Sequence, residues 1–266
     1  MADSEKPAIG RKARKANYRG ATSGQVERAL TIGLIAVSKL ETCTRDECPD
    51  QVRRRVGTQS PFDYLPVRDG TDGPIVGFFR IAATDGSGVA SRVEDCKTSY
   101  EPLSEKRLIG SGVSILEFIR RVDDTPRPFL VVGEEGICGL ANAADLANPI
   151  VGVAICARVL EFETRLNQWI EKQFGDSDEW EKSLDDGCLK AIVDRYNGAR
   201  GRRIDAGRKW MYGTISDKMT ILGVDGGTRK LIKGLRNEVF HTRPPSEVQE
   251  VLNVLEDTER RLTQHR

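Results

Sequence analysis

The chain has 266 residues, of which 30% are charged and 38% hydrophobic. This balance excludes a globally disordered protein, and the length suffices for two modest domains. The 41 basic and 40 acidic residues give a formal net charge of +1. The chain as a whole therefore does not attract nucleic acid electrostatically, and any RNA site must be a local patch.

The cysteines and histidines predict no metal site. None of the six cysteines belongs to a Cys-x-x-Cys pair, and neither histidine lies near one in sequence. The sequence has no run of about 18 apolar residues, so we expect no membrane span. No apolar stretch follows the basic N-terminal residues, so no signal peptide is predicted. We expect a cytoplasmic protein with reduced thiols and no membrane partner.

Residues 1–22 are polar and basic, and we interpret them as a flexible arm. A second local excess of basic residues covers 195–209. Trp210 follows this second stretch directly, so of the three tryptophans it is the better candidate to stack on an RNA base.

The next part of the chain, 23–149, predicts strand pairs joined by tight turns. Residues 64–69 and 75–81 are predicted to form two strands joined by a glycine-containing turn. Residues 49–56 are a candidate short helix before them.

The same pattern recurs about 65 residues later. Residues 128–132 and 137–140 predict strands around the turn 133–136, and the apolar spacing in 113–122 predicts a helix that faces a sheet. Two copies of helix–strand–turn–strand indicate an internal duplication.

This duplicated pattern resembles a tandem pair of CBS domains. The second copy ends Gly139-Leu140-Ala141-Asn142-Ala143-Ala144-Asp145. In the family this run is Gly, two apolar residues, Thr or Ser, two residues and Asp, and the Thr and Asp bind the phosphate and ribose of an adenine nucleotide. The resemblance implies phosphate binding by Asn142 and ribose binding by Asp145.

The first copy departs from that pattern. It has Arg80 at the polar position and Ala83 in place of the Asp, so the resemblance implies that Arg80 approaches a phosphate from the neighbouring cleft. For Asp145 a simpler interpretation stays open, namely that its carboxylate caps the helix that follows.

From residue 150 onward the sequence predicts only helices. The expected segments are 150–174, 187–197, 213–222, 228–240 and 246–263, and the Gly- and Arg-rich stretch 198–212 is a loop or the poorly packed start of a helix.

Arg236 in the fourth of these helices and His241, which follows its C-terminal end, suggest phosphodiester chemistry. A guanidinium fits phosphate oxygens, and an imidazole exchanges a proton near neutral pH. Helical geometry separates the two by about 7.5 Å along the axis. The simpler alternatives are an arginine paired with a carboxylate and a histidine that caps a helix.

The string from Leu235 to His241 resembles the Arg-x4-His signature of HEPN domains, with Asn237 as the polar residue after the arginine and Glu163 as the acidic residue of the first long helix. The resemblance implies a dimeric endoribonuclease that needs no metal or other cofactor. His241 would move the proton, Arg236 would hold the phosphate, and Glu163 or Asn237 would orient Arg236 or the imidazole. The products would end in a 2′,3′-cyclic phosphate.

The sequence thus predicts an α+β tandem CBS module over 23–149 followed by an all-α HEPN helical bundle over 150–266. The expected partners are RNA, an adenine nucleotide that regulates the enzyme, and a second copy of the chain. Two alternatives stay open: a non-catalytic, nucleotide-responsive scaffold protein, and a toxin held inactive by an antitoxin or another protein partner, with antiviral defence as one setting.

Overall fold

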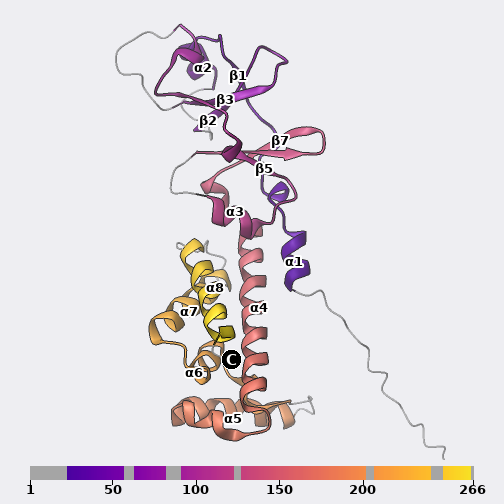
Figure 1. Ribbon diagram of the computed structural model, residues 1–266, viewed down its shortest axis with the longest axis vertical. Coiled ribbons are helices and arrows are strands. Elements are labelled where there is room, and N and C mark those ends of the chain that lie inside the picture. The colour runs from indigo at the N-terminus through magenta and orange to yellow at the C-terminus, as the bar shows by residue number, and fades with distance from the viewer. Residues whose placement is uncertain are drawn as a thin grey trace, which may run out of the picture.

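Two small β-sheets lie at one end of the molecule, and a group of helices lies at the other (Figure 1). The computed structural model describes residues 23–56, 63–81, 91–122, 127–201, 207–240 and 248–264. The predicted N-terminal arm lies outside these ranges. Within them, an α+β N-terminal region precedes a largely helical C-terminal region, as the sequence predicts at this coarse level.

The first sheet has the strand order β1-β2-β3-β4. Its strands are β1 (Cys43–Thr44), β2 (Tyr64–Arg68), β3 (Ile75–Arg80) and β4 (Tyr100–Pro102). β1 is parallel to β2, and the other pairs are antiparallel. Helix α2 (Pro49–Val56) precedes the central hairpin as predicted, and the 3-10 helix η2 (Val93–Asp95) precedes β4.

The second sheet has the order β5-β6-β7, again with one parallel and one antiparallel pair. Its strands are β5 (Leu108–Gly110), β6 (Phe129–Gly133) and β7 (Gly136–Ala141), and the 3-10 helix η3 (Glu105–Arg107) precedes them. Helix α3 (Ile115–Arg121) lies between β5 and β6 and begins where the Ser114 side chain accepts from the Glu117 N–H. A side-chain oxygen at this position satisfies one of the N–H groups that every helix start leaves unpaired.

Strand register confirms the predicted duplication. Val67 lies opposite Gly77 in the first hairpin, and Val131 lies opposite Gly139 in the second. The register shifts immediately after each valine. Equivalent positions in the two copies are therefore fixed by backbone pairing.

Each of these glycines lets another chain segment cross closely. A Cβ on Gly77 would lie 2.6 Å from the carbonyl oxygen of Glu101 in β4, and a Cβ on Gly139 would lie 3.2 Å from the carbonyl oxygen of Val37. Val37 forms an antiparallel bridge with Leu140, as β4 does with β3. The segment before each copy thus pairs with the last strand of the other copy, which joins the two copies.

Helix α4 (Pro149–Phe174) runs from the second sheet through the whole helical region (Figure 1). Asn148 caps its start, and Gly175 ends it with a φ of 53°, a conformation that glycine adopts without strain. The other helices are α1 (Ser23–Ala29), η1 (Ile32–Leu34), η4 (Ala143–Ala147), η5 (Asp178–Ser183), α5 (Asp186–Gly201), η6 (Lys209–Tyr212), α6 (Ile215–Ile221), α7 (Gly226–Phe240) and α8 (Val248–Gln264).

One hydrophobic core crosses from the sheets to the helices. Its members include Phe118 of α3, Val131 of β6, Phe162 of α4 and Leu255 of α8, all almost completely buried. Burying apolar side chains is the main favourable term in folding. The two regions therefore share part of their stability.

The predicted loop over 198–212 is partly wrong. Helix α5 continues to Gly201, and Lys209–Tyr212 forms η6. Trp210 is 4% exposed and packs with Trp180 and Ile192 in a separate small core. This packing contradicts its predicted role as a base-stacking residue, because apolar contacts already cover the ring.

Candidate functional site

The candidate site is a cleft of about 480 Å³ beside the end of β3. This volume is within the range usual for small-molecule sites. Tyr64 contributes from the start of β2, Arg80 from the end of β3, and Arg127 from the segment before β6, so both copies of the duplication contribute. Residues 97–102, which include β4, form the remaining wall.

Three cations and one carboxylate line this cleft. Arg127 pairs with Glu101 at 3.2 Å between its Nη1 and the carboxylate Oε1. Arg80 and Lys97 form no ion pair with any residue in the described ranges. The cleft therefore holds an excess of two positive charges, which favours an anionic ligand.

The backbone holds Arg80 firmly at the cleft, since its N–H donates to the Ser99 carbonyl oxygen at 2.7 Å. Its side chain is exposed, as its place at the end of a strand leads us to expect. Tyr64 and Tyr100 add two aromatic rings to the lining, and burial raises the pKa of the Tyr100 phenol. The cleft thus combines anion-binding groups with ring surface.

Asn142 and Asp145 occupy a different place. Asn142 follows Gly139 by three residues, as Arg80 follows Gly77, so the two are equivalent positions of the duplication. The Asn142 Oδ1 accepts from the Ala144 N–H and the Asp145 Oδ2 accepts from the Asn142 N–H, both at 2.7 Å. These bonds form a reciprocal cap at the start of η4, which is the simpler interpretation considered for Asp145.

The surroundings of Asp145 also alter its acidity. Burial raises the pKa of this carboxyl, while the hydrogen bond from the Asn142 N–H acts in the opposite direction. Neither Asn142 nor Asp145 lines the cleft at Arg80. The structure therefore does not bring the three predicted nucleotide-binding residues together.

In the helical region, α7 extends to Phe240 and carries Arg236, which is half-buried, and Asn237, which is exposed. His241, the predicted proton-transfer residue, lies outside the described residues. Burial raises the pKa of the Cys156 thiol on α4, and the nearby Arg236 guanidinium acts to lower it. Arg236 therefore lies on the side of α7 that faces α4.

Glu163, the predicted acidic partner, lies on α4 seven residues beyond Cys156, about 10 Å further along the helix axis. Its Oε1 accepts from the Nζ of Lys218, on α6, at 2.7 Å. Lys218 is only 2% exposed, so this ion pair is part of the packing between α4 and α6. Sequence reasoning missed Lys218 because a lone lysine in α6 carries no pattern.

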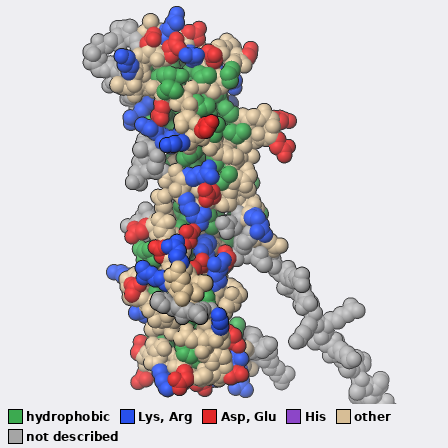
Figure 2. All heavy atoms as spheres, viewed as in Figure 1, with side chains coloured by type: hydrophobic (Ala, Val, Ile, Leu, Met, Phe, Trp, Pro, Cys, Tyr) green, Lys and Arg blue, Asp and Glu red, His purple; other side chains and the backbone are tan. Residues whose placement is uncertain are grey.

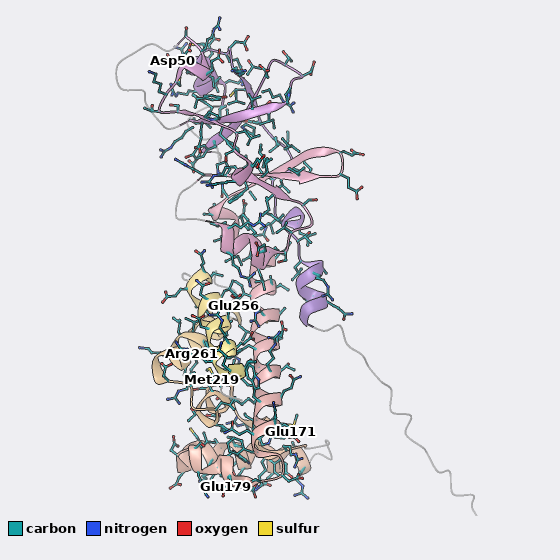
Figure 3. The ribbon with its side chains drawn as sticks, in the orientation of Figure 1. Asp50, Glu171, Glu179, Met219, Glu256 and Arg261 are labelled. Atoms are coloured by element: carbon teal, nitrogen blue, oxygen red, sulfur yellow. The ribbon has the colours of Figure 1, made fainter. Side chains whose placement is uncertain are left out.

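The second basic stretch does not form a positive surface where it is described. Arg208 pairs with Glu171 and with Asp176, and Lys209 pairs with Glu181. Figure 3 labels Glu171 and Glu179 at the end of the molecule farthest from the sheets. Figure 2 shows basic and acidic side chains intermixed over this face of the helical region, so the local charges largely cancel.

Lys97, Arg127, Tyr64 and Tyr100 also escaped the sequence analysis. They come from different segments, and only the pairing of β4 with β3 and the approach of the second copy bring them to one cleft. The described part of the chain holds no group of three or more His, Cys, Asp or Glu placed for a metal ion. None of its helices combines the length and hydropathy needed to cross a membrane.

No protein-family model and no curated protein matches the chain. About half of it is similar to solved CBS-domain pairs, while the helical part is unassigned. The CBS domain of the bacterial CNNM/CorC family Mg²⁺ transporter in complex with ATP is 15% identical with a TM-score of 0.38, covering 49% of this chain and 93% of that one. CBSX2 from Arabidopsis thaliana is 15% identical with a TM-score of 0.37, and the match covers 48% of this chain and 96% of that one. A CBS-domain pair with bound AMP from Klebsiella pneumoniae is 16% identical with a TM-score of 0.37, and the match covers 46% of this chain and 98% of that one.

Proposed function

We propose that the N-terminal region binds one adenine nucleotide per chain, with the phosphate in the cleft at Arg80. The observation that carries the proposal is the pair of cations, Arg80 and Lys97, that face one cleft without an acidic partner in the described ranges. A phosphate monoester carries about 1.5 to 2 negative charges at neutral pH, which matches the excess charge of the cleft.

The other groups of the cleft suit the rest of a nucleotide. Arginine binds phosphate oxygens through two parallel N–H groups, and aromatic rings stack on nucleobases. Tyr100, which is half-buried, would supply ring surface, and Glu101 would supply an acceptor for ribose hydroxyls. The adenine preference itself comes from the resemblance of the repeated motif to CBS domains.

Calorimetric titration with AMP and with ATP tests this proposal. We expect binding of one equivalent, weakened about tenfold or more by Arg80→Ala because a charged hydrogen bond is lost. Asp145→Asn keeps an acceptor for the cap and is the matched control, so its affinity should equal that of the wild type. If Asp145→Asn abolishes binding and Arg80→Ala does not, the ligand lies at the second copy instead.

The helical region is linked to this module by helix α8. The Arg120 guanidinium of α3 pairs with Glu256 of α8, and the Gln249 amide of α8 donates to the Arg120 carbonyl oxygen at 3.2 Å. Figure 3 labels Glu256 on α8, and the first half of that helix lies below α3 in Figure 1. We propose that nucleotide binding changes the conformation of the helical region through this contact. Such coupling requires that the nucleotide bind one conformation of the protein more tightly than another.

For the activity of the helical region we propose metal-independent cleavage of RNA by a dimer. Support comes from the Arg236-x4-His241 string and from its place, since α7 is the penultimate helix and α8 follows it. The RNA 2′-hydroxyl would attack the adjacent phosphate as the bond from phosphorus to the 5′-oxygen breaks, and Arg236 would stabilise the developing charge. One His241 imidazole would take the proton of the 2′-hydroxyl, and another would give a proton to the leaving 5′-oxygen. A second copy would supply the second imidazole that an acid and a base together need.

Incubation of the full chain with mixed RNA in the presence of EDTA, with and without AMP or ATP, tests this activity. We expect products with 2′,3′-cyclic phosphate ends, and a loss of about 100-fold or more in His241→Ala. A folded wild-type protein that leaves RNA intact under all these conditions would favour the non-catalytic scaffold. Growth arrest on expression that His241→Ala relieves would favour the toxin held by a partner.

A further inference from the structure

The strongest feature outside the cleft itself lies directly behind it, on helix α2. The Arg53 guanidinium lies 5.2 Å from the centre of the Phe79 ring. Its Nε donates to the Ile81 carbonyl oxygen at 3.1 Å, and one Nη donates to the Ser99 hydroxyl at 3.4 Å. One side chain therefore contacts the residue before Arg80 and the residue after it, and also the wall that carries Lys97.

The geometry of β3 separates Arg53 from the ligand. Successive side chains of a strand point to opposite faces, so Phe79 and Ile81 face away from the side that Arg80 occupies. Phe79 is fully buried against Val52 of α2, whereas Arg80 is exposed and lines the cleft. Arg53 is not among the lining residues of the cleft.

The Ser99 residue connects the two arginines. Its carbonyl oxygen accepts from the Arg80 N–H, and its hydroxyl accepts from Arg53. Ser99 is 3% exposed, so the loss of either hydrogen bond leaves a buried polar group in need of another partner, which costs free energy. The position of the wall at residues 97–102 relative to the end of β3 thus depends on Arg53.

We propose that Arg53 is a positioning residue for the ligand cleft: it fixes Arg80 and the segment of Lys97 relative to each other, so that both face the phosphate of the proposed ligand. This inference rests on the proposed nucleotide site. A lysine would keep the positive charge but could not contact Ile81 and Ser99 with a planar fork, because an ammonium is a compact point charge.

The test compares Arg53→Lys with Arg55→Lys, a matched control on the same helix. Arg53 pairs with Asp50, and Arg55 pairs with Glu47 and donates to the Thr42 carbonyl oxygen. Neither Thr42 nor Glu47 lines the cleft. Thermal unfolding of both variants without ligand measures the general cost of losing an α2 arginine. AMP and ATP titrations are then run well below both midpoints and at two salt concentrations.

We expect Arg53→Lys to bind the nucleotide about tenfold more weakly than Arg55→Lys. The salt dependence of binding should stay as in the wild type, because the number of cations that meet the phosphate is unchanged. Arg80→Ala, in contrast, should reduce that salt dependence. Equal affinities for the two lysine variants would overturn the inference, and so would a reduced salt dependence in Arg53→Lys.

Amide hydrogen exchange without ligand separates this inference from the proposed function. The Arg80 amide, which bonds to Ser99, should exchange faster in Arg53→Lys than in Arg55→Lys. If the wild type binds neither nucleotide, the ligand proposal fails, and the exchange rates still decide whether Arg53 holds the wall. Unchanged exchange at the Arg80 amide would refute the positioning role.

Discussion

The cations of the helical region and those of the N-terminal cleft differ in their partners. Arg158 of α4 is 7% exposed and forms two hydrogen bonds with Glu259 of α8, at 2.9 and 2.8 Å. Lys218 pairs with Glu163 in a similar way. In the cleft, Arg80 and Lys97 have no such carboxylate within the described ranges.

This difference indicates which charges hold the fold and which are available to a ligand. A buried cation is tolerated only when a carboxylate and hydrogen bonds compensate for its loss of hydration. An exposed cation keeps its water and exchanges it for a phosphate at little cost. Charge count alone cannot separate the two kinds, since each region contains both basic and acidic residues.

The largest effect on stability should come from Glu259. Replacing it by Gln leaves the buried Arg158 with only the more distant Glu161 carboxylate, at 3.9 Å, and we expect the free energy of unfolding to fall by about 3–5 kcal/mol. Asp257→Asn is the control, because Asp257 pairs with Arg260 at 3.1 Å in an exposed position. Denaturant unfolding should show a loss of about 1 kcal/mol or less in that variant. Equal losses of unfolding free energy in the two variants would mean that buried and exposed ion pairs contribute alike to the stability of this fold.

A smaller loss, about 1–3 kcal/mol, should follow from Lys218→Met, because Glu163 loses its partner. The double variant with Glu163→Gln should recover part of this loss, since no unpaired charge remains. Unfolding of both single variants and the double variant measures the coupling. An absence of coupling, together with lost RNA cleavage in folded Glu163→Gln, would return Glu163 to the catalytic role that the sequence suggested.

In the cleft we expect the opposite result for stability. Arg80→Ala removes an exposed side chain without a carboxylate partner in the described ranges, so the free energy of unfolding should change by no more than about 0.5 kcal/mol. Thermal and denaturant unfolding without ligand provide the measurement. A loss as large as that of Lys218→Met would mean that Arg80 supports the fold.

The smallest effect concerns Asp145, whose pKa burial raises above 3.8. A raised pKa means that the folded protein holds the proton more tightly, so the contribution to stability is complete below pH 3.8 and is lost as the pH rises through the folded pKa. Relative to Asp145→Asn, the wild type should therefore gain stability on acidification. We expect the melting temperatures of the two proteins, compared from neutral pH to pH 4, to show this trend.

Asp225 gives the control of opposite sign, because the Thr228 N–H bond lowers the pKa of its carboxyl. Relative to Asp225→Asn, the wild type should lose stability as the pH falls. The same trend in both comparisons would mean that the two carboxyls do not titrate as their surroundings imply.

The sequence by itself determined the duplication and the helices. Short apolar runs on either side of glycine turns located both hairpins, and the helical spacing of apolar residues located α4 and α8 to within a few residues. Arg80 was also identified from its position in the motif. These features depend on local periodicity, which the order of residues records directly.

Only the tertiary structure decided which charges meet. The cleft at Arg80 needs the pairing of β4 with β3 and the approach of Arg127 from the second copy, and the partner of Glu163 comes from α6. Such pairs join residues far apart in the chain, and no local pattern encodes them. The capping role of Asp145 was an open alternative in the sequence, and the fold realised it because η4 begins where β7 ends.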